Sequence, residues 1–132
     1  MTPPVLKTKA LSLYIVEDDL HFRETLIDVM SLRGVEACGV GSAAEALVEL
    51  RTQRPSVIIL DVQLPDIHGF DLCKKLKRFE SLKDVPIILL SASTQYSDPR
   101  DRIEGVLAGA ALFLSKPITM DELWSEIESL LP

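Results

Sequence analysis

Charged and hydroxyl side chains follow four short apolar runs of the sequence, and together they have the chemistry to handle a phosphoryl group. They are Glu17, Asp18, Asp19, Asp61, Ser91 and Lys116. Carboxylates with no His or Cys cluster beside them favour Mg²⁺ over zinc as a bound metal. A lysine and a hydroxyl supply the positive charge and the hydrogen bond that a transferring phosphoryl group needs. Asp61 is then the candidate nucleophile, because carboxylates form aspartyl phosphates in some ATPases.

The apolar runs that precede these residues have the length and composition of buried strands. Five such runs occur, and they cover residues 11–16, 35–40, 57–60, 87–90 and 111–114. Runs of four to six residues with β-branched side chains suit strands that are buried on both faces. The sequence therefore predicts a sheet whose strands are covered on both sides.

The segments between these runs are amphipathic and carry signals typical of helix ends. We expect helices over residues 20–33, from 42 to just before 55, over 69–79, from 98 and from 119. Gly34 is a suitable left-handed C-terminal cap for the first helix. Ser42 and Thr119 each open a capping box, and Asp98 with Pro99 forms an N-cap followed by a first-turn proline.

Five strands alternating with five helices predict an α/β fold with a parallel sheet between two helical layers. Ligands of such sheets bind beyond the carboxyl ends of the strands. All six candidate residues stand there: Glu17, Asp18, Asp19, Asp61, Ser91 and Lys116. Each of them alone has an ordinary structural explanation; Asp19, for example, suits the N-cap of a helix. Several acids at one rim, however, repel each other unless a cation offsets their charge. Their convergence therefore predicts a Mg²⁺-dependent phosphoryl site.

Length and composition indicate a single globular domain. The chain has 132 residues, of which 47% are hydrophobic and 26% charged. No apolar run approaches the 18 residues of a membrane span, and no signal peptide is evident. We expect a flexible leader over residues 1–10, a domain over residues 11–132 and a cytoplasmic location. The net charge of −6 disfavours direct binding to nucleic acid or anionic membranes. Cys38 and Cys73 are expected to be reduced, buried thiols.

The sequence around the candidate site resembles the receiver domain of two-component response regulators. The matching segments are YIVEDD at 14–19, ILDVQLPD at 59–66, LLSA at 89–92 and FLSKP at 113–117. The resemblance extends over about residues 11–131, with all elements in order. It implies a flavodoxin-like (βα)5 doubly wound sandwich with a five-stranded sheet of order 2-1-3-4-5. That order places the first and third strands side by side.

The resemblance also implies how the acidic residues act. Asp61 would accept a phosphoryl group from the phosphohistidine of a sensor kinase or a phosphotransfer protein. Asp18 would bind Mg²⁺ directly, Glu17 would act through a metal-bound water, and the main-chain carbonyl of Gln63 would complete the protein ligands. Such a domain is a signalling module that catalyses its own phosphorylation and dephosphorylation, and it acts on an output domain or protein that the sequence does not identify.

Three further residues would carry the signal. Ser91 would hydrogen-bond the phosphoryl oxygen, and Lys116 would pair with it. Phe113 would turn inward as Ser91 moves, so that the fourth helix, the fifth strand and the fifth helix report phosphorylation. The resemblance also implies a cis peptide between Lys116 and Pro117.

Some positions depart from the common family pattern. Glu17 stands where aspartate is frequent, which is compatible with function. His68 replaces an aspartate before Gly69, and we expect a solvated loop histidine there. The fifth helix has no arginine, so the dimer that winged-helix members form through that helix is not expected. Gln63 and Ser93 occupy positions that tune dephosphorylation in the family.

Three alternative functions fit the sequence less well than a receiver domain does. A pseudo-receiver, which is a phosphorylation-independent interaction module, usually lacks one of the acids, the hydroxyl or the lysine, whereas this chain has all of them. A haloacid-dehalogenase-like phosphohydrolase needs a second aspartate where Gln63 stands. A flavodoxin-like redox module needs a phosphate-binding loop after the first strand, where these acids would repel phosphate. A test for Mg²⁺-dependent phosphorylation distinguishes a phosphoacceptor receiver domain, which is phosphorylated, from a pseudo-receiver, which is not.

Overall fold

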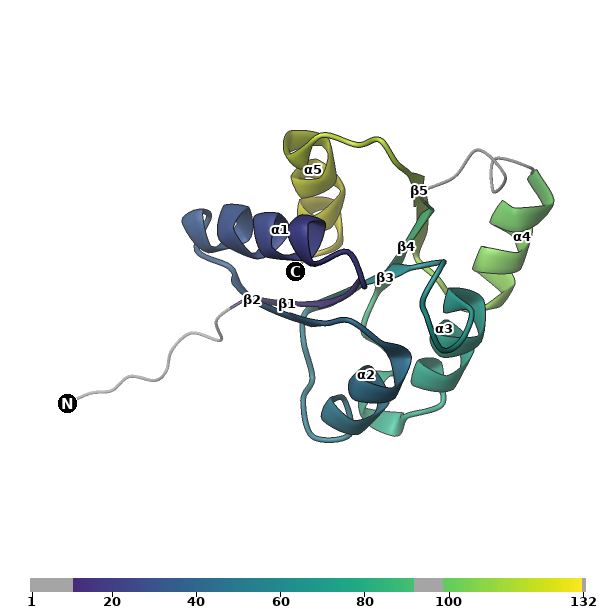
Figure 1. Cartoon of the computed structure of the whole chain (residues 1–132). Coiled ribbons are helices and arrows are strands. Elements are labelled where there is room, and N and C mark those ends of the chain that lie inside the picture. The colour runs from purple at the N-terminus through teal and green to yellow at the C-terminus, as the bar shows by residue number, and fades with distance from the viewer. Residues whose placement is uncertain (1–10, 92–98, 132) are drawn as a thin grey trace.

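The computed structural model describes residues 11–91 and 99–131, which form a five-stranded parallel sheet between layers of helices (Figure 1). The strands lie in the order β2-β1-β3-β4-β5. Their bounds are β1 Ser12–Val16, β2 Glu36–Val40, β3 Val57–Asp61, β4 Ile87–Ser91 and β5 Leu112–Ser115. The predicted fold class and strand order are therefore confirmed.

The helices cover both faces of this sheet (Figure 1). They are α1 Leu20–Leu32, α2 Ala43–Glu49, α3 Gly69–Lys77, α4 Pro99–Leu107 and α5 Met120–Leu130, and a short 3₁₀ helix η2 spans Glu80–Leu82. α1 and α5 lie on one face, while α2, α3 and α4 lie on the other. Within the described residues, no helix is long and apolar enough to cross a membrane.

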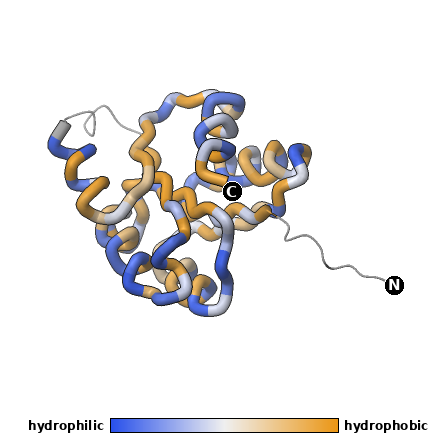
Figure 2. The backbone as a smooth tube through the Cα atoms, turned by 180° about the vertical axis from the view of Figure 1, so that it is seen from behind, coloured by the Kyte–Doolittle hydropathy of each residue, from blue (hydrophilic) through white to orange (hydrophobic). Residues whose placement is uncertain are grey.

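The sheet separates two hydrophobic cores, because alternate residues of each inner strand point to opposite faces. Ile59 of β3 packs in the core beneath α1 and α5, whereas Ile58 and Leu60 pack in the core beneath α2 and α3. Every residue of β3 and β4 is buried. Figure 2 shows these central strands as mostly hydrophobic. Because these inner strands are packed on both faces, they fix the positions of the candidate site residues Asp61 and Ser91 at their carboxyl ends.

Burial at the sheet edge differs from expectation at one cysteine. Cys73, on α3, is buried, but Cys38 is exposed, and both thiols are free. The prediction of two buried thiols was wrong for Cys38 because β2 is an edge strand, along which alternate residues reach solvent.

Most helix signals are confirmed. Thr119 forms the capping box with Glu122, and Gly34 follows α1 with a φ of 78°. Ser42 caps α2 by accepting from the N–H of Glu45, but the Glu45 carboxylate accepts from the N–H of Gly41 instead of completing the box. α2 and α3 end earlier than expected, at Glu49 and Lys77. The N-cap expected at Asp98 lies outside the described residues.

Candidate functional site

Three acidic side chains meet at the carboxyl ends of β1 and β3. Glu17, Asp18 and Asp61 each place one carboxylate oxygen within 4.8 Å of the others. Glu17 and Asp18 follow β1, Asp61 ends β3, and the two strands are hydrogen-bonded neighbours. Glu17 and Asp61 are only 2% and 4% exposed, whereas Asp18 is exposed. The cluster is therefore a mostly buried set of oxygen atoms with access to solvent on one side.

Lys116 supplies positive charge to this cluster. Its Nζ lies 2.6 Å from Glu17 Oε1 and 4.0 Å from Asp61 Oδ2. The ammonium also lies 4.2 Å from the ring centroid of Phe22, a cation–π contact that no sequence pattern indicated. The Lys116–Pro117 peptide is cis, as predicted. One ammonium faces several carboxylates, so the described residues leave an excess of negative charge here.

The surroundings of Asp61 favour its protonated form when no metal is bound. Burial, followed by the hydrogen bond and the charge of Glu17, raises the pKa of Asp61 to about 7. The N–H of Gln63, which donates to Asp61 Oδ1 at 3.0 Å, and the charge of Lys116 act in the opposite direction. A hard divalent cation would offset the repulsion between the Glu17 and Asp61 carboxylates, and its preferred ligands are carboxylate oxygens. The donor set therefore fits Mg²⁺.

The chain around Glu17 is fixed by several hydrogen bonds. Its N–H donates to the carbonyl of Val40, and its Oε2 accepts from the N–H of Asp19. The Arg23 guanidinium donates to the Glu17 carbonyl, a role that helical periodicity did not reveal. Asp19 is also the N-cap of α1, as predicted, because its side chain accepts from the N–H of Phe22.

The loop between β3 and α3 differs from expectation at two residues. His68 is half-buried and caps α3, since its Nδ1 accepts from the N–H of Phe70 at 3.1 Å and its ring lies against the Phe70 ring. It is therefore not a simple solvated loop histidine. Asp66, for which no role was predicted, accepts hydrogen bonds from the N–H groups of Ala43 and Ala44 in α2. No local sequence signal could reveal that contact, because its partners are more than 20 residues away.

Ser91 and Phe113 are both buried near this rim. Ser91 is 0% exposed at the end of β4, and its carbonyl accepts from the N–H of Lys116 at 2.7 Å. Phe113 is 8% exposed and lies inward, with its ring 6.1 Å from that of Phe70. The Arg102 guanidinium lies 5.6 Å from the centroid of the Phe113 ring. Ser93 lies outside the described residues.

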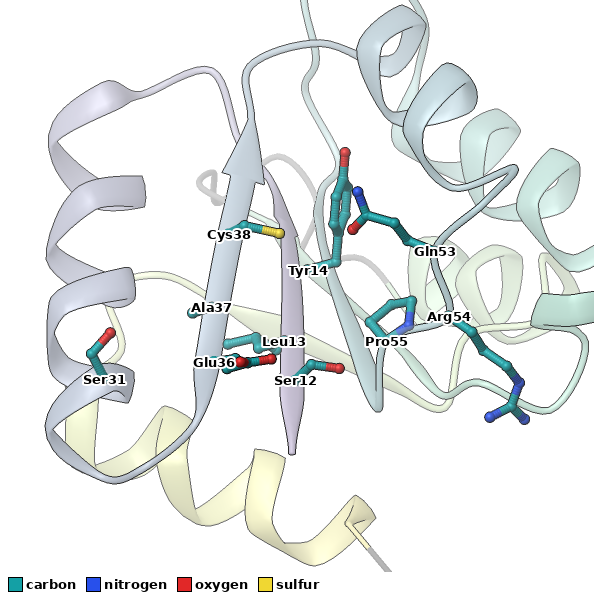
Figure 3. Close-up of a pocket in the computed structure, with 10 residues that line it drawn as sticks. All are labelled: Ser12, Leu13, Tyr14, Ser31, Glu36, Ala37, Cys38, Gln53, Arg54 and Pro55. Atoms are coloured by element: carbon teal, nitrogen blue, oxygen red, sulfur yellow. The ribbon is translucent and has the colours of Figure 1, made fainter. Parts of the chain in front are cut away.

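A pocket of about 630 Å³ lies elsewhere in the molecule (Figure 3). It borders the edge strand β2, and its lining includes Tyr14, Cys38, Gln53 and Arg54. None of the residues predicted for the phosphoryl site lines it. The Tyr14 hydroxyl donates to the Glu49 carboxylate at 2.8 Å, so this polar group is already satisfied within the protein.

Comparison with known proteins identifies relatives of the whole described domain. The family model for the response regulator receiver domain matches residues 13–128. Transcriptional regulatory protein GltR of Pseudomonas aeruginosa is 38% identical over 120 residues, which are 91% of this chain and 48% of that protein. Transcriptional regulatory protein AfsQ1 of Streptomyces coelicolor is 36% identical over 120 residues, 91% of this chain and 51% of that protein. The chain thus spans about half the length of these curated relatives.

Solved structures show the same fold. The signal receiver domain of a signal transduction histidine kinase from Syntrophus aciditrophicus is 34% identical with a TM-score of 0.82, over 92% of this chain and 90% of that one. The chemotaxis response regulator CheY4 of Vibrio cholerae is 27% identical with a TM-score of 0.86, over 93% and 100% of the two chains. The chain therefore belongs to the response regulator receiver domain family, whose members are signalling domains.

Proposed function

We propose that this domain accepts a phosphoryl group on Asp61 from the phosphohistidine of a sensor kinase or a phosphotransfer protein. The observation that carries this proposal is the cluster of three carboxylates from two neighbouring strands, with the Lys116 ammonium beside it. Glu17, Asp18, Asp61 and the main-chain carbonyl of Gln63 would hold Mg²⁺, with Glu17 acting through a water. When bound, Mg²⁺ would supply positive charge to the phosphoryl oxygens.

The chain's own groups account for the transfer step. A carboxylate oxygen of Asp61 attacks phosphorus, and the bond between phosphorus and the histidine nitrogen breaks as the new oxygen–phosphorus bond forms. Asp61 Oδ1 is held by the N–H of Gln63, while Oδ2 faces Lys116. Lys116 then pairs with a phosphoryl oxygen, and the Ser91 hydroxyl donates a hydrogen bond to another. Hydrolysis of the acyl phosphate returns the domain to its starting state.

The same reaction provides a signal. The phosphoryl group adds negative charge and acceptor oxygens beside Ser91, so it favours the conformer in which that hydroxyl is drawn towards it. Phe113 is buried in the described structure, and its inward position would be stabilised by the same shift. The surface of α4, β5 and α5 would then present a different face to an output domain or protein. The gene-regulatory names of the relatives are compatible with such an output.

Intact mass after incubation with a small acyl phosphate, with and without Mg²⁺, tests the proposal. We expect the wild-type chain to gain one phosphoryl group only with Mg²⁺, and Asp61→Asn to gain none. Wild-type chain that binds Mg²⁺ but gains no mass from either the acyl phosphate or a phosphorylated histidine donor would contradict it. That result would leave a phosphorylation-independent interaction module as the better description.

A further inference from the structure

The β3–α3 loop, residues 62–68, is attached to the domain at its base and at its tip. At the base, Gln63 pairs with His68 in an isolated antiparallel bridge, and the N–H of Gly69 donates to the carbonyl of Val62 at 2.7 Å. Gly69 allows this closure, because a Cβ there would lie 2.5 Å from the carbonyl oxygen of Asp61. The base therefore fixes the loop to its own strand, but not to the rest of the rim.

At the tip, Asp66 attaches the loop to a different element. Its Oδ1 accepts from the N–H of Ala43 at 3.0 Å, and its Oδ2 accepts from the N–H of Ala44 at 2.8 Å. These amides open α2, where N–H groups have no partner within the helix and the helix dipole favours an anion. The hydrogen bond from Ala43 is the largest cause that lowers the pKa of Asp66. The hydrogen bonds from α2 therefore favour the ionised form of this exposed carboxylate.

α2 is in turn connected to the chain that carries Glu17. The residues just before α2 continue from β2, and the carbonyl of Val40 accepts from the N–H of Glu17 at 3.0 Å. The N–H of Gly41 donates to the Glu45 carboxylate near this point. Asp66 therefore connects the loop of Gln63 with the loop of Glu17. The connection runs through the hydrogen bonds to the start of α2, the main chain back to Val40 and the hydrogen bond that Glu17 donates to Val40.

We propose that Asp66 is a positioning residue for the acidic rim. Its two hydrogen bonds to α2 hold the β3–α3 loop, and so they hold the Gln63 main chain in place beside Asp61 for a divalent cation. This inference rests on the proposed Mg²⁺ site. Groups that orient metal ligands without touching the metal typically change metal affinity 10- to 100-fold when removed. Asp66 acts through one loop, so we expect an effect near the lower end of that range.

Calorimetric Mg²⁺ titration of the full chain tests this role, with Ser42→Ala as matched control. Ser42 caps the same helix, and the hydrogen bonds described for its Oγ are both with Glu45 of α2: Oγ accepts from the N–H of Glu45 and donates to the Glu45 carboxylate. We expect Asp66→Ala to raise the Mg²⁺ dissociation constant about tenfold. Asp66→Asn, which retains one carbonyl acceptor, should raise it about threefold. Ser42→Ala should leave it unchanged while weakening the helix cap.

Amide hydrogen exchange provides a second readout that needs no metal. The N–H of Gln63 donates to Asp61 Oδ1, so its exchange rate reports whether the loop stays beside Asp61. We expect faster exchange of this amide in Asp66→Ala and unchanged exchange in Ser42→Ala, both in metal-free buffer. Wild-type Mg²⁺ affinity in Asp66→Ala, or equal weakening in Ser42→Ala, would overturn the inference.

The two readouts separate this inference from the proposed function. If the wild-type chain binds no Mg²⁺, the proposed metal site is wrong, and the exchange rates still decide whether Asp66 anchors the loop. Unchanged exchange of the Gln63 amide in metal-free Asp66→Ala would then refute the anchoring role as well. If the wild-type chain binds Mg²⁺ and gains a phosphoryl group, only the comparison of variants bears on Asp66.

Discussion

The carboxylates of Glu17 and Asp61 share a buried site with a single nearby ammonium among the described residues, that of Lys116. Glu17 is paired with Lys116 at 2.6 Å, whereas Asp61 Oδ2 lies 4.0 Å from the same ammonium. Asp61 is therefore the acid whose charge is poorly compensated. A bound cation and a phosphoryl group both act on this residue, so its protonation affects both.

This imbalance predicts an unusual pH dependence of stability in metal-free buffer. The unfolded chain releases the Asp61 proton near its ordinary pKa of 3.8, and the folded domain releases it near 7. Between these values the folded state binds more protons, so stability should fall as pH rises from about 4 to 7. The shift sets an upper limit of about 4 kcal/mol for the loss. Urea unfolding with EDTA at several pH values measures it.

Asp61→Asn provides the control for that experiment, because it removes the titrating group and keeps the shape. We expect the variant to lack most of the decline and to be more stable than the wild-type chain at pH 8 without metal. Equal decline in both proteins would show that another group is responsible.

The two thiols should differ in reactivity, since one is on an edge strand and one is in the core. Cys38 is exposed, whereas Cys73 is buried, and burial raises the pKa of Cys73 to about 11. We expect a thiol reagent to label one cysteine per folded chain, and both cysteines only after denaturation. Partial desolvation of the Cys38 thiol by its neighbours, together with the charges of Glu49 and Glu36, raises its pKa, so its labelling should accelerate with rising pH. Fast labelling that persists in Cys38→Ser would contradict this assignment.

At the scale of elements, the contact between α4 and β5 depends on a glycine. A Cβ at Gly105 would lie 2.9 Å from Cδ2 of Phe113 and 3.3 Å from Cδ1 of Leu89. The inward position of Phe113 therefore requires a residue without a side chain at position 105 of α4. At this contact Phe113, the proposed switch residue of β5, meets the helix that would report its position.

Gly105→Ala should consequently destabilise the domain although alanine is the better helix former. Overpacking of this kind costs about 1–3 kcal/mol, against a helix-propensity gain of about 1 kcal/mol. In a Phe113→Ala background the clash with the ring disappears, and the same substitution should be neutral or stabilising. A double-mutant cycle by chemical denaturation measures this difference. Additive effects of the two substitutions would show that the ring does not restrict position 105.

Local signals were sufficient to predict the elements but not all their ends. The capping box at Thr119 and the glycine at position 34 are confirmed, because the residues that form them lie close together in sequence. α2 ends at Glu49 rather than near Pro55, since a proline excludes helix from the residue before it but does not fix where the last turn stops. Long-range caps such as Asp66 have no local signature at all.

At the scale of the whole molecule, alternation of strands and helices predicted the parallel sheet and its two helical layers. It did not predict the strand order, because several orders are compatible with right-handed crossovers. The order 2-1-3-4-5 came from the family resemblance and is confirmed. It places β1 beside β3, and so it explains why acids more than 40 residues apart in the sequence form one cluster. The carboxyl-end rule located this rim, but the roles of its residues remain predictions.

Locating the phosphoryl group within the chain tests directly whether Asp61 is the phosphoryl acceptor. Borohydride reduces an acyl phosphate to an alcohol, so a phosphorylated aspartate becomes homoserine and can be identified by peptide mass spectrometry. After treatment with an acyl phosphate and Mg²⁺, we predict homoserine at position 61 and unmodified aspartate at positions 18 and 19. Without Mg²⁺, position 61 should also stay aspartate. Homoserine at another acid, or a phosphoryl group that survives on the chain without any homoserine, would contradict the account.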